Sequence, residues 1–186
     1  SPESRSWNIV GSVASGVLLE LFSWEATFLV TGVVGLVALA INQITKDKKT
    51  DLDKVKAVYA YATSLRYVAL ELGLEGIKPR RCALTMARGW GDCKDKATII
   101  VTMLRELGVP STLVLVRTAM RGDLPKDAPP SLGVFDHAIA YVPSLDLYLD
   151  GTAEHTGSTE LPAMDRNAFA LQINEGKAKL VRLPQP

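Results

Sequence analysis

The sequence has no cluster of Lys and Arg interleaved with aromatic residues, and its 21 basic residues nearly balance its 20 acidic ones. The resulting net charge of +1 argues against a nucleic-acid-binding protein, which needs a concentrated basic surface to neutralise phosphates. No Cys and His spacing is typical of a zinc site, and no acidic loop is of the EF-hand kind that binds calcium. We therefore expect no nucleic-acid partner, no metal ion and no cofactor.

Cysteine and histidine are scarce, with two residues of each in the chain. Cys82 and Cys93 cannot form a disulfide framework, and a single bridge between them is neither required nor excluded by the sequence. A catalytic thiol or imidazole therefore has to come from these two cysteines or from His137 and His155.

Charge is almost missing from the N-terminal quarter of the chain, where Glu20 and Glu25 are the only charged residues between positions 7 and 44. Residues 26–45 carry no charge, and a helix of this length spans about 30 Å, the thickness of a bilayer hydrocarbon core. The run ends at the basic sequence KDKK, as membrane spans commonly do. We predict that residues 1–48 are an apolar helical hairpin that associates with a membrane, in preference to a hairpin buried in a soluble protein.

The stretch LLELFSWEATFLVTGVVGLVALAI within this segment resembles a helix pair of major facilitator transporters. Two helices cannot form a transporter, so the resemblance implies no transport activity for this chain.

Residues 49–186 form the predicted hydrophilic domain, which begins with a helix. Thr50 and Asp51 provide N-cap chemistry for a helix that is expected to start near Leu52 and to end at Gly73. Apolar residues recur there at helical spacing and predict its buried stripe: Val55, Val58, Tyr59, Ala62, Leu65 and Ala69. The basic pair Arg80-Arg81 is expected in a solvated loop after this helix.

Alternating apolar and β-branched residues dominate the second half of the domain and predict strands. The predicted strands cover residues 111–118, 135–142, 147–152, 169–173 and 178–183. Residues 119–133 are polar and rich in proline, which predicts a surface loop. The domain is therefore predicted to be α+β, with a helical half packed on an antiparallel sheet.

Cys93 stands at a predicted helix start, because Asp92 is a natural N-cap after the glycine-rich turn of Gly89 and Gly91. A thiol attacks carbonyl groups as its thiolate, which the unpaired N–H groups and the dipole of a helix N-terminus favour. The glycines are expected to keep the approach to the sulfur open. Cys82 has no such setting and is interpreted as a small buried residue.

His137 lies within a predicted strand, and a hairpin brings a carboxylate to it. If the turn centres between Pro143 and Ser144, Asp150 lies directly opposite His137, with Cβ atoms roughly 4.5–5.5 Å apart. A carboxylate at that distance can fix the imidazole tautomer and stabilise the imidazolium, as the third member of a catalytic triad does. Asp136 is a competing candidate for the partner of His137, but adjacent strand residues point to opposite faces, so its side chain is expected to point away from that of His137. His155 is interpreted as a surface residue or as a contact at the rim of the site.

Three separated segments, GWGDCKDKATIIVTMLRELGVPSTLVLVRT, FDHAIAYV and LYLDGTAE, resemble the core blocks of the transglutaminase-like superfamily. The similarity is greatest to bacterial proteins with the signature GDCKDKA, and it runs from about Leu52 to Leu183. It implies a papain-like fold in which Cys93 is the nucleophile, His137 the general base and Asp150 the orienting acid. The block SLRYVALELG is also similar, and it makes Tyr67 a candidate for the lining of the site, or alternatively a core aromatic.

The resemblance implies acyl transfer through a thioester at Cys93, with peptide or amide substrates. Release to water, as in a protease or amidase, is slightly favoured over transfer to an amine. The alternatives are a non-catalytic, membrane-tethered peptide-binding module and a chain whose functional part is the apolar hairpin. Many relatives work outside the cytoplasm, whereas the basic stop favours a cytoplasmic domain. The sequence therefore predicts membrane association without fixing the side of the membrane.

Overall fold

The computed structural model describes residues 37–69, 78–124, 131–174 and 177–185. Residues 37–45 are helical, and residues 1–36, which make up most of the predicted apolar hairpin, lie outside the described residues. Within the described ranges, no helix combines the length and the apolar character that a membrane crossing requires. The elements below belong to the compact unit that begins at Ala38.

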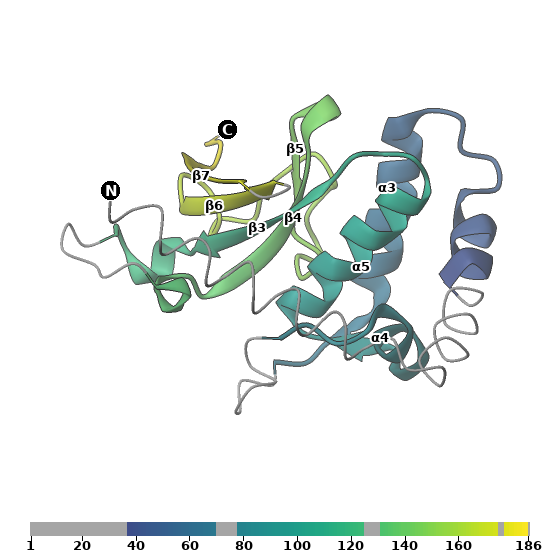
Figure 1. The fold of residues 1–186 in the computed structure, drawn as a ribbon, viewed down its shortest axis with the longest axis horizontal. Coiled ribbons are helices and arrows are strands. Elements are labelled where there is room, and N and C mark those ends of the chain that lie inside the picture. Colours follow the sequence, from purple (N-terminus) through teal and green to yellow (C-terminus); the bar gives the residue numbers. More distant parts are fainter. Residues whose placement is uncertain (1–36, 70–77, 125–130, 175–176, 186) are drawn as a thin grey trace, which may run out of the picture. The chain divides into compact units, whose positions relative to one another are not determined.

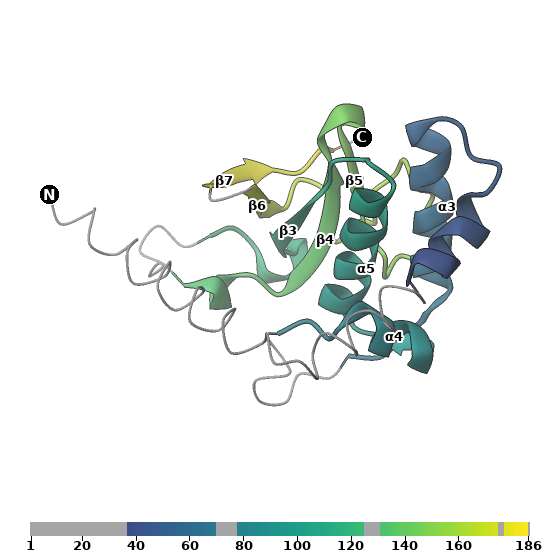
Figure 2. The same ribbon diagram turned by 45° about the vertical axis from the view of Figure 1, so that its right-hand side comes forward.

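The first helix of the domain, α3 (Asp51–Ser64), begins where the sequence predicted. Its N-cap is Thr50, whose Oγ1 accepts a hydrogen bond from the backbone N–H of Asp53 at 3.1 Å. Four residues of the predicted stripe are buried: Val55, Val58, Tyr59 and Ala62. The stripe packs against helix α5, which Figures 1 and 2 show beside α3.

The predicted end of this helix at Gly73 was wrong, because the helix stops at Ser64 and Leu65 is extended. The next residues form the short strand β1 (Arg66–Tyr67), which pairs in parallel with β2 (Trp90–Gly91). Pairing with a distant segment overrides the helical spacing that suggested a longer helix.

A short helix, α4 (Cys82–Arg88), occupies residues that the sequence analysis assigned to a loop. It has no side-chain N-cap hydrogen bond, so the usual start signal is missing from the sequence. It ends at Gly89, whose φ of 71° is the left-handed conformation that glycine adopts without strain.

Helix α5 (Cys93–Glu106) is the central helix and lies beside strand β4 in Figure 1. Its predicted start at Cys93 is confirmed, with Asp92 as the N-cap. Most of its apolar side chains are buried: Ala97, Ile99, Ile100, Val101, Met103 and Leu104. These side chains anchor the helix, so that its N-terminus has a fixed position relative to the sheet.

The sheet has five strands in the order β5-β4-β3-β6-β7, and every neighbouring pair is antiparallel. Their bounds are β3 (Thr112–Arg117), β4 (His137–Val142), β5 (Leu147–Leu149), β6 (Phe169–Asn174) and β7 (Lys177–Arg182). All five strands were predicted, and the mixed helix and sheet architecture confirms the α+β prediction. In the register of β3 and β4, Val116 faces His137 and Val114 faces Ile139. His137 therefore shares a sheet face with the buried core residues Val114, Val116 and Ile139.

The hairpin of β4 and β5 differs from its predicted register by two residues. The pairs are Ala140 with Leu149 and Val142 with Leu147, because a 3₁₀ turn (Pro143–Leu145) and a left-handed Asp146 make the connection longer than a two-residue turn. The predicted strand over 147–152 also ends early, at Leu149.

Candidate active site

The sulfur of Cys93 belongs to the first residue of α5, and a capping box fixes this helix end. Oδ1 of Asp92 accepts from the backbone N–H of Asp95 at 3.2 Å, and Oδ2 of Asp95 accepts from the N–H of Asp92 at 3.3 Å. Cys93 is half-buried and forms no disulfide. The remaining N–H groups of this first turn and the helix dipole favour negative charge at the sulfur or on a bound oxyanion.

Arg80 supports the capping box from the preceding loop. Its Nη1 lies 2.7 Å from Oδ2 of Asp95 and 3.3 Å from Oδ2 of Asp92, and its backbone N–H donates to Oδ1 of Asp95 at 2.7 Å. Only 8% of the Arg80 side chain is exposed. The expectation of a solvated surface arginine was therefore wrong for this residue. Arg80 and Arg88 also place their guanidinium groups over the ring of Trp90, at 5.7 and 5.3 Å.

Gly91 allows the strand before Cys93 to pass close to its surroundings. A Cβ at this position would lie 2.7 Å from Cγ2 of Thr85 and 2.9 Å from Cβ of Asp95. The close approach is therefore within the protein, and Gly89 is required by the end of α4. Both glycines have structural roles that are independent of an open approach to Cys93.

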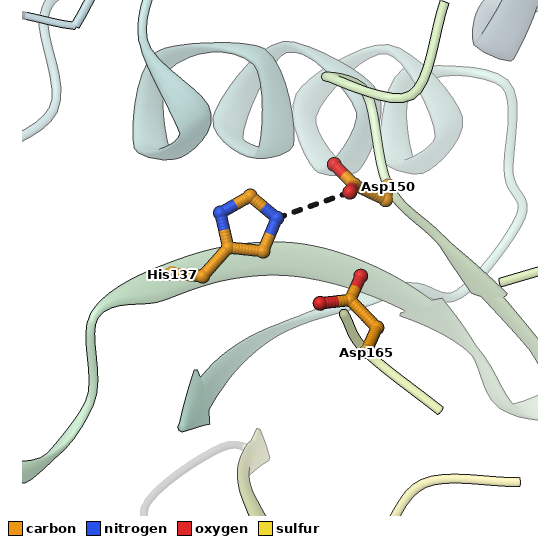
Figure 3. Close-up of side chains that lie close together, drawn as sticks. All are labelled: His137, Asp150 and Asp165. Carbon is orange, nitrogen blue, oxygen red and sulfur yellow. Dashed lines mark ion pairs between the residues drawn. The ribbon is translucent and has the colours of Figure 1, made fainter. Parts of the chain in front are cut away.

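His137 is the first residue of β4 and is 7% exposed. Its Nε2 lies 3.1 Å from Oδ2 of Asp150, although the pair does not meet hydrogen-bond geometry. A dashed line marks this ion pair in Figure 3. Burial alone lowers the pKa of His137, but its interactions with Asp150 and with the Cys93 side chain outweigh burial and raise the pKa to about 11. The ring is therefore an imidazolium at neutral pH, and it interacts with both the Cys93 side chain and the Asp150 carboxylate.

Asp150 follows β5 directly and is 1% exposed. Its Oδ1 accepts from the backbone N–H of Thr152 at 2.8 Å and from Oγ1 of Thr152 at 2.7 Å, which leaves Oδ2 for His137. Burial raises the pKa of Asp150, but the hydrogen bonds and charge of its partners outweigh burial and hold the pKa below its usual range. Asp150 is therefore a carboxylate with a fixed orientation.

Lys96 ties α5 to the turn after Asp150. This lysine is completely buried, and its Nζ donates to the backbone oxygen of Gly151 at 3.0 Å. Burial lowers its pKa, opposed by the charges of Glu154 and Asp150. The helix that carries Cys93 and the turn that carries Asp150 are thus joined directly, a link that the sequence analysis missed.

Asp165 is a further acidic residue that sequence analysis did not find. It lies in a turn before β6, and one of its oxygens lies within 4.8 Å of ligand atoms of His137 and Asp150. Figure 3 shows its carboxylate directed toward the other two side chains. Burial raises the pKa of Asp165 to about 7, with additional contributions from Asp150 and Asp136 and an opposing one from His137.

One nitrogen and two carboxylate oxygens at such spacing form a set of the kind that can hold a metal ion. Here Nε2 of His137 already pairs with Oδ2 of Asp150, and the Cys93 side chain interacts with the same ring. We therefore interpret His137, Asp150 and Asp165 as an acid–base cluster.

The remaining sequence candidates lie away from this cluster or have other partners. The Asp136 carboxylate accepts hydrogen bonds from the backbone N–H and the Oγ1 of Thr118 at 2.9 and 2.7 Å. This agrees with the expectation that its side chain points away from that of His137. His155 is exposed, as predicted for a surface residue. Cys82 is partly buried, with its sulfur 3.4 Å from Oγ1 of Thr102. Tyr67 is 42% exposed, which argues against the core reading of this residue.

Comparisons with known proteins identify the fold and the family of the chain. The family model of the transglutaminase-like superfamily matches residues 39–145, and no curated protein matches the chain. The crystal structure of a "putative protease" from Parabacteroides distasonis shares the fold over 80% of this chain, with a TM-score of 0.59 and 16% sequence identity. The match covers 27% of the chain of that protein. Because the family model matches more than half of the residues of this chain, the chain belongs to the transglutaminase-like superfamily.

Proposed function

We propose that this protein is a cysteine-dependent enzyme that transfers acyl groups of peptide or amide substrates through a thioester at Cys93. The observation that carries the proposal is the placement of His137 between the thiol of Cys93 at a helix N-terminus and the buried carboxylate of Asp150. Together these parts supply what nucleophilic catalysis by a thiol needs. The start of α5 stabilises an anion, His137 carries the proton, and Asp150 orients His137.

In the first step the Cys93 thiolate attacks the carbonyl carbon, and a C–S bond forms while the carbonyl oxygen becomes an oxyanion. Backbone N–H groups at the start of α5 are the available donors for that oxyanion. The tetrahedral intermediate then breaks its C–N bond, and the His137 imidazolium gives its proton to the leaving amine. Asp150 keeps the ring in place throughout and stabilises its charged form.

In the second step neutral His137 takes a proton from the acceptor, which attacks the thioester and releases the thiol. With water the product is a carboxylic acid, and with an amine it is a new amide. We favour water, in agreement with the description of the Parabacteroides distasonis protein as a "putative protease". The acceptor is part of the proposal and is left to experiment.

The test is to incubate the wild-type chain with peptide and amide substrates, with and without an amine acceptor, and to quench the reaction in acid. Intact-mass analysis and peptide mapping are expected to find an acyl group on Cys93 and none on Cys82, which serves as the internal control. Turnover without the amine supports hydrolysis, and an amine-dependent product supports transamidation. Saturable peptide binding with neither acylation nor product would favour the binding-module alternative.

We further propose that the N-terminal segment attaches the protein to a membrane, on the strength of the uncharged run over residues 26–45. The double substitution Val30→Arg and Val34→Arg is expected to abolish co-sedimentation of the full chain with lipid vesicles. A charged side chain near the centre of a span is unfavourable by about 2.5–3.5 kcal/mol. Lys46→Arg is the matched control and should leave sedimentation unchanged. Equal sedimentation of wild type and double variant would contradict membrane insertion.

A further inference from the structure

Asp165 is completely buried, and neither of its carboxylate oxygens has a hydrogen-bond partner among the residues that the structure describes. A buried carboxylate anion without a donor is strongly unfavourable, because nothing replaces its hydration. A protonated carboxyl group avoids this problem, since it is neutral and can itself donate a hydrogen bond. The position of Asp165 therefore needs an explanation that involves its proton.

Backbone hydrogen bonds fix the turn that carries Asp165, and its side chain is completely buried. The backbone N–H of Asp165 donates to the backbone oxygen of Pro162 at 3.0 Å, and the backbone oxygen of Asp165 accepts from the N–H of Ala168 at 3.1 Å. The oxygen of the preceding residue, Met164, accepts from the N–H of Ala119 at 2.8 Å. The turn is thus tied to both ends of its own loop and to the segment after β3, and it directs the carboxyl group inward.

Three titratable groups surround the Asp165 carboxyl group. His137 and Asp150 lie within 4.8 Å of it, and Asp136 influences it from the residue before β4. Two ionised carboxylates beside one imidazolium would leave an unbalanced negative charge in the interior, and a proton held by one of them removes it. Asp150 is the better anion, because Thr152 donates two hydrogen bonds to it. Of the two carboxyl groups, Asp165 is therefore the one that holds the proton.

We propose that Asp165 is a positioning residue of the active site, whose protonated carboxyl group donates a hydrogen bond to Asp150 and whose ionisation at higher pH strengthens the hold of His137 on its proton. Oδ2 of Asp150, which faces His137, accepts no hydrogen bond within the described part of the chain and can therefore accept this one. In the neutral state the donated proton draws negative charge away from the imidazolium. After ionisation, a second carboxylate faces the same ring.

The consequence for catalysis rests on the proposed function, in which His137 gives its proton to a leaving amine. A stronger hold on that proton slows this donation, so acyl transfer is expected to decline above about pH 7, where the pKa of Asp165 lies. Asp165→Asn supplies an N–H donor at every pH and cannot ionise. The variant is expected to lose the decline above pH 7, so that the ratio of its activity at pH 8 to its activity at pH 6 exceeds the ratio of the wild type.

A direct test that needs no substrate uses NMR on the full chain labelled with [¹³C]aspartate and [¹⁵N]histidine. In the wild type, one aspartate carboxyl signal is expected to titrate with a midpoint near pH 7, in accord with the pKa of Asp165. The signal should be absent from Asp165→Asn and present in the matched control Asp123→Asn, which changes a side chain that is 78% exposed. The ring signals of His137 should show loss of its proton about one pH unit or more earlier in Asp165→Asn.

A role of Asp165 that is only structural would change stability without moving the His137 titration, and that result overturns the proposal. It is also overturned if every wild-type aspartate finishes titrating below about pH 6, a measurement that holds even if Asp165→Asn does not fold. A confirmed NMR titration with no acyl transfer on any substrate would instead contradict the proposed function and leave the proton assignment intact.

Discussion

Replacing His137 with alanine is expected to lower the rate of Cys93 alkylation by iodoacetamide about 10²-fold at pH 6. In the wild type the imidazolium beside the sulfur favours the thiolate, and its raised pKa keeps the ring charged from mildly acidic to alkaline pH. The wild-type alkylation rate at pH 6 should therefore exceed the rate of the His137→Ala variant at the same pH. A free thiol with an ordinary pKa of about 8.5 is only about 0.3% ionised at pH 6, which sets the size of the expected loss.

In the proposed mechanism, the same substitution removes the proton carrier of both chemical steps. Positioned general acid–base catalysis contributes about 10²–10⁴-fold to rates, so turnover of any substrate found for the wild type should fall by a factor in this range. The alkylation effect should shrink as the pH approaches 9, where an unassisted thiol is itself ionised. This pH dependence separates loss of the imidazolium from general damage to the fold.

His155→Ala is the matched control, because it removes the other histidine of the chain, which is exposed. Its alkylation profile should superimpose on that of the wild type. Peptide mapping assigns the rates to Cys93 and reports Cys82 separately. Equal rates at pH 6 for wild type and His137→Ala would mean that the three residues are assembled without an activated thiol, and the binding-module alternative would then gain support.

The sequence was sufficient to find the Cys93 end of the site, because that end depends on local signals. An N-cap carboxylate, a first-turn acid and a helical apolar stripe are all contiguous in sequence and act within one helix. Asp92 and Cys93 therefore occupy their predicted positions. The buried partners of the same helix were not predictable. Arg80 and Lys96 look like surface residues until tertiary contacts supply Asp95 and the Gly151 oxygen.

The pairing of His137 with Asp150 survived an error in the predicted register. The observed connection moves the register by two residues, which is one full period of side-chain alternation along a strand. An error of one residue would have placed the two side chains on opposite faces. With the two-residue error they become diagonal rather than direct neighbours, a separation that the histidine ring and the carboxylate bridge.

Asp165 was beyond reach of sequence reasoning for a different physical reason. Its segment, residues 161–168, mixes apolar and polar residues without a helical or strand period, so the sequence does not mark Asp165 as buried. Its placement follows from the antiparallel pairing of β6 with β3, which brings the turn before β6 next to the start of β4. Non-local strand pairing of this kind leaves no periodic trace in the sequence.

Replacing Asp95 with alanine is expected to lower the free energy of unfolding by about 3–5 kcal/mol, the usual loss when one partner of a buried ion pair is removed. Asp95 is 1% exposed and receives both the Nη1 and the backbone N–H of Arg80 at 2.7 Å. Without it, the Arg80 guanidinium remains buried and loses its carboxylate contact at 2.7 Å, while Oδ2 of Asp92 lies 3.3 Å from Nη1. The capping box also loses one of its two hydrogen bonds.

Urea unfolding followed by circular dichroism measures the effect, and for a chain of this length the melting temperature should drop by roughly 6–20 °C. Asp51→Ala is the matched control, since it removes an aspartate from an exposed ion pair with Lys54 and should change stability by less than about 1 kcal/mol. A loss in Asp95→Ala no larger than in this control would contradict the structural role of the Arg80 pair.

A second substitution distinguishes the buried charge from the lost helix cap. Adding Arg80→Met to Asp95→Ala removes the buried guanidinium together with its carboxylate partner and should recover part of the stability, because replacing both partners of a buried pair costs far less than removing one. The part that is not recovered measures the cap, for which about 0.5–2 kcal/mol is expected. The cap also sets the direction of the N–H groups beside Cys93. Alkylation of Cys93 at pH 6 should therefore be slower in the double variant than in the wild type, even where the stability returns. Recovery of both stability and alkylation would show that Arg80 and Asp95 hold the fold together without shaping the environment of the thiol.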